Sequence, residues 1–273
     1  MDGAVIPRRF HFVWGLKRRP GPLHLVHYLC LASCLEVNDP HEVKLHAPAE
    51  PEGEWWERIR DRVSWVEMHP PEESTRLSYR DRHVRRFSYA HGADFARLDV
   101  LLSEGGVYAD LDTLFLRRLP EALFEQPFVI GRELDVRDGE GRLAPSLCNA
   151  FLMSAPGSRF GRVWRDGMED AFDGSWSRHS TLLPERLRRE LPGSVHVEPE
   201  GSFFPFRWTR EGIADMLERR VELNGAYSMH LWAHLWWSRR RRDFSGFHAG
   251  LIDEGYIRSA DTTYAVAARR FLS

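Results

Sequence analysis

Two aspartates, Asp110 and Asp112, stand one residue apart in the segment VYADLDTLFL, directly behind a pair of glycines. In a strand, residues i and i+2 point to the same face, so the two carboxylates would lie side by side. Two negative charges that close repel each other unless a cation neutralises them. Hard divalent ions such as Mg²⁺ and Mn²⁺ prefer carboxylate oxygens and often join protein ligands to nucleotide phosphates. The pair therefore predicts a site for a divalent cation and a diphosphate.

A second pair of candidate residues precedes the first. Asp94 and Arg97 are three residues apart in GADFARLDVLLSEGG, which places them on one face of a predicted helix. A carboxylate and a guanidinium directed into one cleft suit sugar hydroxyls and phosphate oxygens, respectively. The alternative is an ion pair on the helix surface. Gly105 and Gly106 end this helix and would allow the backbone to approach a ligand closely.

The hydrophobic pattern predicts the elements that position these residues. Strands are expected at residues 10–14, 42–48, 63–69, 107–116, 127–134, 147–155, 194–199 and 226–232, and helices at 23–37 and 82–104. Strands separated by helices indicate βαβ units and a parallel sheet that binds ligands at the carboxyl ends of its strands. Residues 135–146 form the segment expected to be most flexible, a candidate lid beside the site.

Composition limits the class of protein and its partners. The chain has 273 residues, of which 42% are hydrophobic and 12% aromatic, enough for the core of one large α/β domain. A net charge of −2 gives no reason to expect a nucleic-acid partner. Three cysteines, Cys30, Cys34 and Cys148, fit a reducing compartment. No signal-peptide core or transmembrane segment is evident, so the prediction is a cytoplasmic protein, with peripheral membrane contact left open.

The order and spacing of these residues resemble a known family. An S/A-D-x-x-R sequence followed after about seven residues by G-G-V/I-Y-x-D-x-D is similar to the DXD-containing sugar transferases of glycosyltransferase family 32, relatives of mannosyl, α-1,4-galactosyl and toxin glucosyl transferases. The segments IPRRFHFVWG (6–15) and AYSMHLWAHLWW (226–237) resemble the opening and late aromatic-histidine blocks of that family. Most of residues 120–225 has no firm correspondence.

This resemblance implies a fold. It implies an α/β, GT-A-like domain with a Rossmann-like mixed sheet flanked by helices and a smaller acceptor-side region, spanning residues 1–273. Residues 1–118 would form the half that binds the nucleotide sugar, and residues 119–273 the acceptor-side half. The family often has a glycine-proline pair in the acceptor-side region, where this chain has WSRHSTLLPERL (176–187). The identity of the acceptor is therefore open.

The resemblance also implies roles in binding the donor. Trp14 would follow the first strand and stack near the nucleotide base, and Tyr108 would pack near the ribose or the sugar. Asp94 and Arg97 would contact the donor sugar and its phosphates. Asn149 would face the anomeric centre of the donor.

Cofactor binding follows from the same resemblance. Asp110 and Asp112 would hold Mn²⁺ or Mg²⁺ on the diphosphate, with His230 as a third ligand from a late strand or turn. Gly105 and Gly106 would let the backbone approach the nucleotide sugar. Asp94, Arg97, Asp112 and Asn149 are then the candidate catalytic residues.

The implied activity is a metal-dependent, retaining hexosyl transfer. The donor would be a nucleotide sugar, UDP-linked rather than GDP-linked, and the acceptor a hydroxyl of a saccharide, glycolipid or small molecule, as in bacterial polysaccharide or glycoconjugate biosynthesis. The cation would stabilise the leaving nucleoside diphosphate while the anomeric carbon gains oxocarbenium character. Since no covalent nucleophile is evident, front-face attack by the acceptor is expected.

Other functions are compatible with parts of the sequence. DLDTL resembles the D-x-D-x-T motif of haloacid-dehalogenase phosphatases, but Leu114 stands where threonine is required, and such an enzyme would act on phosphosugars. His230 and His234 have the i, i+4 spacing of a zinc helix but lack the glutamate of H-E-x-x-H. Ten tryptophans also fit a non-catalytic carbohydrate-binding protein. The run Arg239 to Arg242 beside Trp236 and Trp237 fits a solvated face or an anionic surface.

Overall fold

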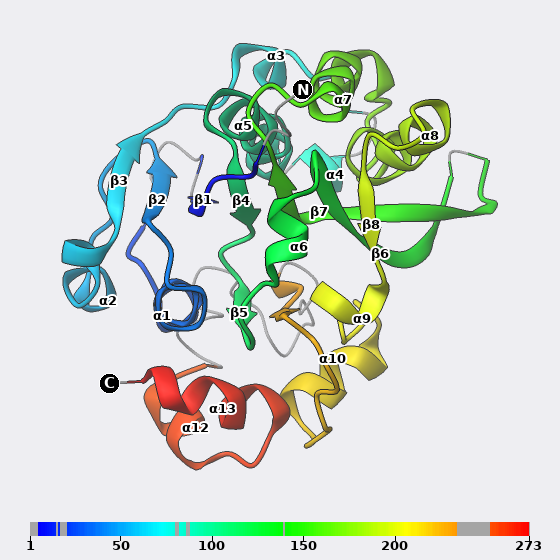
Figure 1. Ribbon diagram of the computed structural model, residues 1–273. Coiled ribbons are helices and arrows are strands. Elements are labelled where there is room, and N and C mark those ends of the chain that lie inside the picture. Colours follow the sequence, from blue (N-terminus) through cyan, green and yellow to red (C-terminus); the bar gives the residue numbers. More distant parts are fainter. Residues whose placement is uncertain are drawn as a thin grey trace.

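The computed structural model describes residues 5–14, 16, 21–79, 82–85, 88–138, 140–233 and 252–272. Its strands are β1 Arg9–Val13, β2 Glu42–Ala47, β3 Ser64–Glu67, β4 Gly106–Ala109, β5 Thr113–Phe115, β6 Phe128–Arg137, β7 Leu143–Ser154, β8 His196–Glu198 and β9 Ser228–His230. The longer helices are α1 Leu25–Asn38, α5 Ser88–Glu104, α7 Arg159–Ala171, α8 Leu183–Glu190 and α10 Arg210–Leu217 (Figure 1). The shorter ones are α2 Glu54–Glu57, α3 Glu72–Thr75, α4 Arg82–Arg85, α6 Glu121–Phe124, α9 Glu200–Phe203, α12 Glu254–Ser259, α13 Thr263–Ala268, the 3₁₀-helices η1 Arg60–Arg62 and η4 Arg269–Phe271, and the π-helix η2 Arg178–Leu182.

The main sheet is mixed. Within the described chain it contains seven strands in the order β3-β2-β1-β4-β7-β6-β8. The strands β3, β2, β1 and β4 run parallel, whereas β7 pairs antiparallel with both β4 and β6. The expected Rossmann-like mixed sheet flanked by helices is therefore confirmed. The parallel pairing indicated by the strand-helix alternation holds for β3, β2, β1 and β4 and for β6 with β8, whereas β7 is antiparallel to both of its neighbours.

Successive side chains along each strand point to opposite faces of the sheet, so the hydrophobic core is divided into one cluster on each face. Val107 and Ala109 in β4 join the cluster that contains α1 and α13, while Tyr108 between them joins the cluster of α5, α7 and α8. β7 repeats the pattern, because Phe151 and Met153 pack on the α1 side and Leu152 on the α5 side. Figure 1 shows α5 and α7 near the top of the view and α12 and α13 at the bottom. Burial on both faces explains why these strands read as continuous apolar runs.

The segment expected as one strand at residues 107–116 is interrupted by a turn. After β4, the amide of Asp110 still donates to the carbonyl of Ala150 at 2.8 Å, and the amide of Thr113 then donates back to the carbonyl of Asp110 at 3.0 Å. β5 starts only at Thr113 and pairs antiparallel with β9 in a separate two-stranded sheet. Asp110 and Asp112 therefore lie in a turn, and the strand geometry predicted for them is wrong.

The candidate lid at residues 135–146 is largely an extension of two strands. β6 continues to Arg137 and β7 begins at Leu143, so only a short turn separates them. Arg137 pairs with Leu143 in register, and Asp138 accepts backbone hydrogen bonds from Glu140 and Arg142, each at 2.9 Å. The described residues of this segment, Asp138 and residues 140–142, instead form the tip of a β-hairpin.

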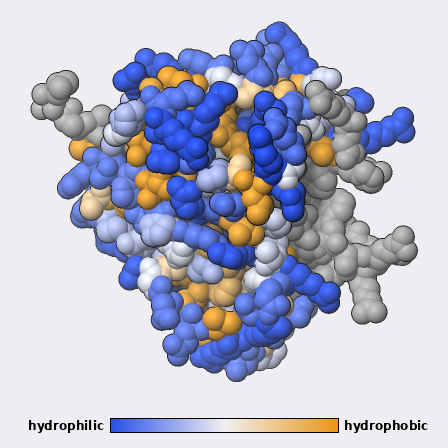
Figure 2. All heavy atoms as spheres, turned by 90° about the vertical axis from the view of Figure 1, so that its right-hand side faces the viewer, coloured by the Kyte–Doolittle hydropathy of each residue, from blue (hydrophilic) through white to orange (hydrophobic). Residues whose placement is uncertain are grey.

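Charged and polar groups cover most of the face drawn in Figure 2, with the hydrophobic residues in separate groups among them. Such scattered apolar exposure is normal for a folded domain. Among the described residues, no helix has both the length and the apolar character needed to cross a bilayer. Cys30, Cys34 and Cys148 are buried free thiols.

Candidate active site

A cavity of about 1370 Å³ opens at the carboxyl ends of β1 and β4. β1 is followed by β2 and β3 on one side of the sheet, whereas β4 lies on its other side, so the strand order reverses between β1 and β4. Open α/β sheets bind ligands at such a reversal. Of the residues predicted from the sequence, the cavity wall includes Trp14, Asp94, Arg97, Tyr108, Asp110, Asp112, Asn149 and His230.

The turn after β4 brings Asp110 and Asp112 next to His230. Thr113 and His230 are register partners in the β5–β9 pair, which places the His230 ring beside the turn. Its Nε2 lies 2.9 Å from Asp112 Oδ1 and 3.8 Å from Asp110 Oδ2. The amide of Ala233 donates to Asp112 Oδ2 at 2.8 Å and fixes this carboxylate. The cluster thus presents two carboxylates and one imidazole, with ligand atoms within 4.8 Å of one another.

The charges in this cluster favour a cation. Burial raises the pKa of Asp110, and the neighbouring carboxylate of Asp112 adds to that effect, while Arg97 and His230 oppose it. Burial would lower the pKa of His230, but Asp112 and Asp110 raise it above its usual value. A divalent ion can replace the histidine proton as the positive charge, because two oxygens and one nitrogen suit Mn²⁺ or Mg²⁺. The three side chains, Asp110, Asp112 and His230, therefore fit the predicted metal as ligands.

Arg97 connects the metal-ligand cluster to Asp94. Its Nη2 lies 3.0 Å from Asp94 Oδ1 and 3.3 Å from Asp110 Oδ1, and its Nη1 donates to the carbonyl of Asn149 at 2.6 Å. The guanidinium also lies 4.6 Å above the ring of Tyr108, whose hydroxyl donates to Asp110 Oδ1 at 2.6 Å. Arg97 is 4% exposed. Asp94 and Arg97 are therefore part of a buried network at the cavity wall, and the helix-surface ion pair is excluded.

The carboxylate of Asp94 is held from two sides. Asn149 Nδ2 donates to Oδ1 at 2.7 Å, and His179 Nε2 lies 3.0 Å from Oδ2. Burial alone would raise the pKa of Asp94, but Arg97 and then His179 lower it to about 2. Asp94 is 8% exposed and still contributes to the cavity wall. It therefore stays ionised as a hydrogen-bond acceptor for a polar ligand.

Trp14 forms the wall on the β1 side. Its backbone amide donates to the carbonyl of His46 at 2.8 Å, which continues the β1–β2 ladder by one residue. Its ring packs edge to face on His27, with the centroids 6.0 Å apart. The indole is 7% exposed, and the cavity reaches it. This is the position expected for an aromatic ring beside a nucleotide base.

Gly105 and Gly106 do not reach the cavity. They lie at the start of β4, whereas Asp110 follows its end. Gly105 has φ +66° and a Cβ there would lie 2.6 Å from Pro156 Cδ; Gly106 has φ +113° and a Cβ would lie 2.4 Å from the carbonyl oxygen of Arg9. The close backbone approach inferred from the glycine pair is therefore made to the protein's own chain.

Two residues were missed by the sequence analysis: Glu133, which lines the cavity, and His179, which contacts Asp94 from behind the cavity wall. Glu133 in β6 is 7% exposed, accepts a hydrogen bond from Ser146 Oγ at 3.1 Å, and has its pKa raised by burial to about 7. An acidic residue at a buried position of an apolar strand was the signal for it. His179, fully buried on η2, has no local signal, because its partner Asp94 is distant in sequence.

Some predicted residues lie outside the described part of the chain. They are His234 of the zinc alternative and the block with Trp236, Trp237 and Arg239 to Arg242. His230 itself belongs to the short strand β9, where the predicted i, i+4 helical arrangement does not apply.

Residues 39–129 match a family model described as "Glycosyltransferase sugar-binding region containing DXD motif". Asp94, Arg97, Asp110 and Asp112 fall within the match. Trp14, Asn149 and His230 fall outside it, and the fold brings them to the same cavity.

A curated relative is Glucan organizing enzyme 1 of Cryptococcus neoformans var. grubii. It is 31% identical over 242 residues, an alignment that covers 85% of this chain and 64% of the relative. The chain thus spans less than two thirds of the length of that protein.

Solved glycosyltransferase structures are similar at lower identity. PaToxG glycosyltransferase has a TM-score of 0.49 at 17% identity, covering 70% of this chain and 72% of that one. The galactosyltransferase LgtC, in complex with donor and acceptor sugar analogs, has a TM-score of 0.45 at 15% identity, covering 90% of this chain and 96% of that one.

Proposed function

We propose that the protein is a metal-dependent glycosyltransferase of the GT-A type, because residues 39–129 match the family model of the glycosyltransferase sugar-binding region that contains a DXD motif. Its donor is a nucleotide sugar with a hexose-type group, UDP-linked in preference to GDP-linked. Its acceptor is a hydroxyl of a saccharide, glycolipid or small molecule. The name of the fungal relative refers to glucan, which supports a saccharide among these acceptors.

The observation that carries the proposal is the convergence of Asp110, Asp112 and His230 at the wall of a cavity that Asp94 and Arg97 also line. Bound Mn²⁺ or Mg²⁺ supplies Lewis-acid stabilisation of the leaving nucleoside diphosphate. A phosphosugar phosphatase has no need for the Asp94–Asn149 pair, and a carbohydrate-binding module has no need for a metal cluster. Both alternatives leave half of the site unexplained.

The residues of the chain have distinct roles in this proposal. Trp14 stacks on the nucleotide base, and Asp94 and Asn149 bind the sugar. Arg97 donates to the carbonyls of Ala93 and Asn149 and contacts Asp94 and Asp110, so its main role is to hold the two carboxylates in place and to balance their charge. Tyr108 orients Asp110 through its hydroxyl.

Acceptor binding is proposed for residues from the second half of the chain that line the cavity. They include Leu143 of the hairpin tip, Trp176 and Trp208. Aromatic and apolar side chains suit the faces of sugar rings. We also propose retention of anomeric configuration with front-face attack, as the family resemblance implies, and a cytoplasmic location stays a prediction.

A screen of nucleotide sugars tests the proposed function. The purified protein is incubated with UDP- and GDP-sugars with Mn²⁺ or with excess EDTA, and released UDP or GDP is measured. Hydrolysis that requires Mn²⁺ is expected for at least one UDP-sugar, and NMR of the product anomer reports retention. Undiminished turnover in EDTA, metal-independent sugar binding without nucleotide affinity, or release of inorganic phosphate from phosphosugars would contradict it.

A further inference from the structure

His179 lies at the back of the donor site, on the π-helix η2. The carbonyl of Ser177 accepts hydrogen bonds from the amides of both Thr181, at 2.9 Å, and Leu182, at 3.1 Å, so the turn is wider than an α-helical one. Trp164 Nε1 donates to the His179 carbonyl at 2.9 Å and fixes the turn from behind. Such π-helical turns occur frequently at functional sites, where they redirect a side chain.

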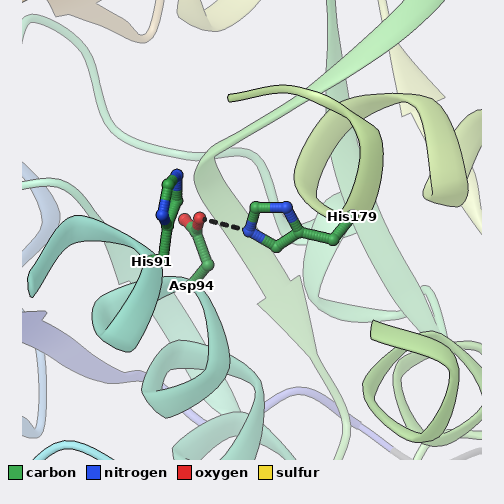
Figure 3. A group of neighbouring side chains, drawn as sticks. All are labelled: His91, Asp94 and His179. Carbon is green, nitrogen blue, oxygen red and sulfur yellow. Dashed lines mark hydrogen bonds and ion pairs between the residues drawn. The ribbon is translucent and has the colours of Figure 1, made fainter. Parts of the chain in front are cut away.

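The imidazole of His179 points at the carboxylate of Asp94 (Figure 3). Its Nε2 lies 3.0 Å from Asp94 Oδ2, whereas the other oxygen, Oδ1, accepts a hydrogen bond from Asn149 and forms an ion pair with Arg97. Since a carboxylate cannot donate, the proton between them is carried by Nε2. A carboxylate has about four acceptor sites. The three protein donors therefore leave about one site for the cavity.

The ring of His179 is held by apolar packing. It stacks on Phe95 with the centroids 6.2 Å apart and meets Phe172 edge to face at 5.0 Å. His179 is 0% exposed. Its Nδ1 has no hydrogen-bond partner among the described residues. The hydrogen bond to Asp94 is therefore the polar interaction for which this buried ring is oriented.

His91 completes a buried group with Asp94 and His179 whose ligand atoms lie within 4.8 Å (Figure 3). The Nδ1 atom of His91 forms a hydrogen bond with the hydroxyl of Tyr79 at 2.9 Å. A divalent ion on Asp94 would add two charges beside the buried Arg97 guanidinium, which lies 3.0 Å from the same carboxylate. It would also displace the proton that joins His179 to Asp94. Charge balance therefore favours the hydrogen-bonded arrangement over a second metal site.

We propose that His179 is a positioning residue for donor recognition, which fixes the rotamer of Asp94 so that its remaining acceptor site faces the sugar of the nucleotide sugar. The same turn that carries His179 places Trp176, Ser180 and Thr181 in the cavity wall. The hydrogen bond thus ties the acceptor-side wall to the donor-side carboxylate. This inference rests on the proposed function, because it requires a nucleotide sugar in the cavity.

Two substitutions separate the hydrogen bond from the packing. His179→Phe keeps a planar ring against Phe95 and Phe172 but cannot donate, whereas His179→Gln keeps an N–H donor at a similar reach. His91→Phe is the matched control, since it removes another buried imidazole of this group without removing a hydrogen bond to Asp94. Thermal unfolding of all three variants verifies that each is folded at the assay temperature.

The measurement compares a ligand that has a sugar with one that lacks it. UDP-glucose and UDP-galactose hydrolysis with Mn²⁺ gives kcat/KM, and inhibition by UDP gives its Ki. His179→Phe is expected to lower kcat/KM by about 10-fold to 100-fold, the effect of one charge-assisted hydrogen bond, with the Ki of UDP within about 2-fold of wild type. His179→Gln should recover most of the loss, and His91→Phe should stay within about 2-fold.

The outcomes distinguish this inference from the proposed function. Wild-type protein that hydrolyses no nucleotide sugar contradicts the function itself. With an active wild type, the inference is overturned if His179→Phe is unchanged, if the Ki of UDP rises in parallel, or if His179→Gln is no better than His179→Phe. Stoichiometric Zn²⁺ binding to the Asp112→Asn variant that is lost in its His179→Phe derivative also overturns it, and absence of such binding supports it.

Discussion

His230 Nε2 lies 2.9 Å from Asp112 Oδ1, although 118 residues separate them in the chain. The antiparallel pairing of β5 with β9 produces this contact, because Thr113, next to Asp112, is the register partner of His230. The amides of Leu231 and Ala233 add hydrogen bonds to the carbonyl and the carboxylate of Asp112, at 2.9 and 2.8 Å. The late histidine is therefore fixed to the aspartate turn by backbone as well as by side chain.

Asp112→Asn should abolish metal-dependent donor hydrolysis. The substitution removes one of the two carboxylates of the cluster but keeps an acceptor for the Ala233 amide, so the fold should persist. Loss of several kcal/mol of charge stabilisation corresponds to a rate decrease of roughly 10³-fold or more. Released UDP is measured at saturating Mn²⁺. Asp166→Asn, at an exposed position on α7, is the control, and wild-type turnover in Asp112→Asn would remove this residue from the site.

Trp14→Ala should raise the donor KM by about 10-fold while lowering kcat less. Stacking of an aromatic ring on a base contributes about 1–3 kcal/mol, and it acts on the ground state and the transition state alike. Because UDP and the UDP-sugar donor share the same base, the Ki of UDP should rise together with the KM of the donor. This differs from His179→Phe, for which the Ki of UDP should stay nearly unchanged. Trp55→Ala is the control, since Trp55 packs on Tyr28 away from the cavity. An unchanged Ki would exclude Trp14 from the base pocket.

Gly106→Ala should destabilise the fold without altering donor affinity. A Cβ would meet the Arg9 carbonyl oxygen at 2.4 Å, and the φ of +113° is unfavourable for any L side chain. The free energy of unfolding should fall by about 3 kcal/mol or more. Gly141→Ala has φ +78° but no atom within 4 Å, so it should cost only the conformational penalty of about 1–2 kcal/mol. Urea unfolding measures both; equal losses would show that the close approach at Gly106 does not matter.

Stability should fall between pH 7.5 and pH 5 because two buried histidines, His11 on β1 and His46 on β2, form a neutral hydrogen-bonded pair. His11 Nε2 donates to the Gly105 carbonyl at 3.0 Å, so His46 Nε2 must donate to His11 Nδ1, also at 3.0 Å. Burial lowers the pKa of His11 to about 4 and that of His46 to about 3. The unfolded chain takes up these protons near pH 6.5 and the folded chain does not, so acid favours unfolding.

The expected loss is roughly 2 kcal/mol for each of these histidines between pH 7.5 and pH 5. His46→Gln keeps the donor to His11 and should reduce the loss by about that amount, measured as the difference in unfolding free energy at the two pH values. His69→Gln, at an exposed position, should leave the loss unchanged. A pH dependence in His46→Gln equal to that of wild type would show that His46 is not the group that titrates.

The sequence by itself determined the strands of the main sheet and the motif of three aspartates and one arginine. Period-2 and continuous apolar runs mark β1, β2 and β6 because burial on both faces selects their residues. The spacing of Asp94, Arg97, Asp110 and Asp112 is local, which is why one helix and the strand after it were sufficient to predict a common site.

Only the tertiary structure decided how these groups meet. The aspartates converge through a turn, because β5 leaves the main sheet to pair with β9, and a pairing between distant segments has no local signature. His179 reaches Asp94 from a π-helical turn for the same reason. Gly105 and Gly106 are needed because a Cβ there would collide with Pro156 and with the carbonyl of Arg9, respectively. These groups come close to the glycines only after the sheet has formed. Local sequence fixes residue type and periodicity, whereas long-range contacts fix which polar groups share a buried space.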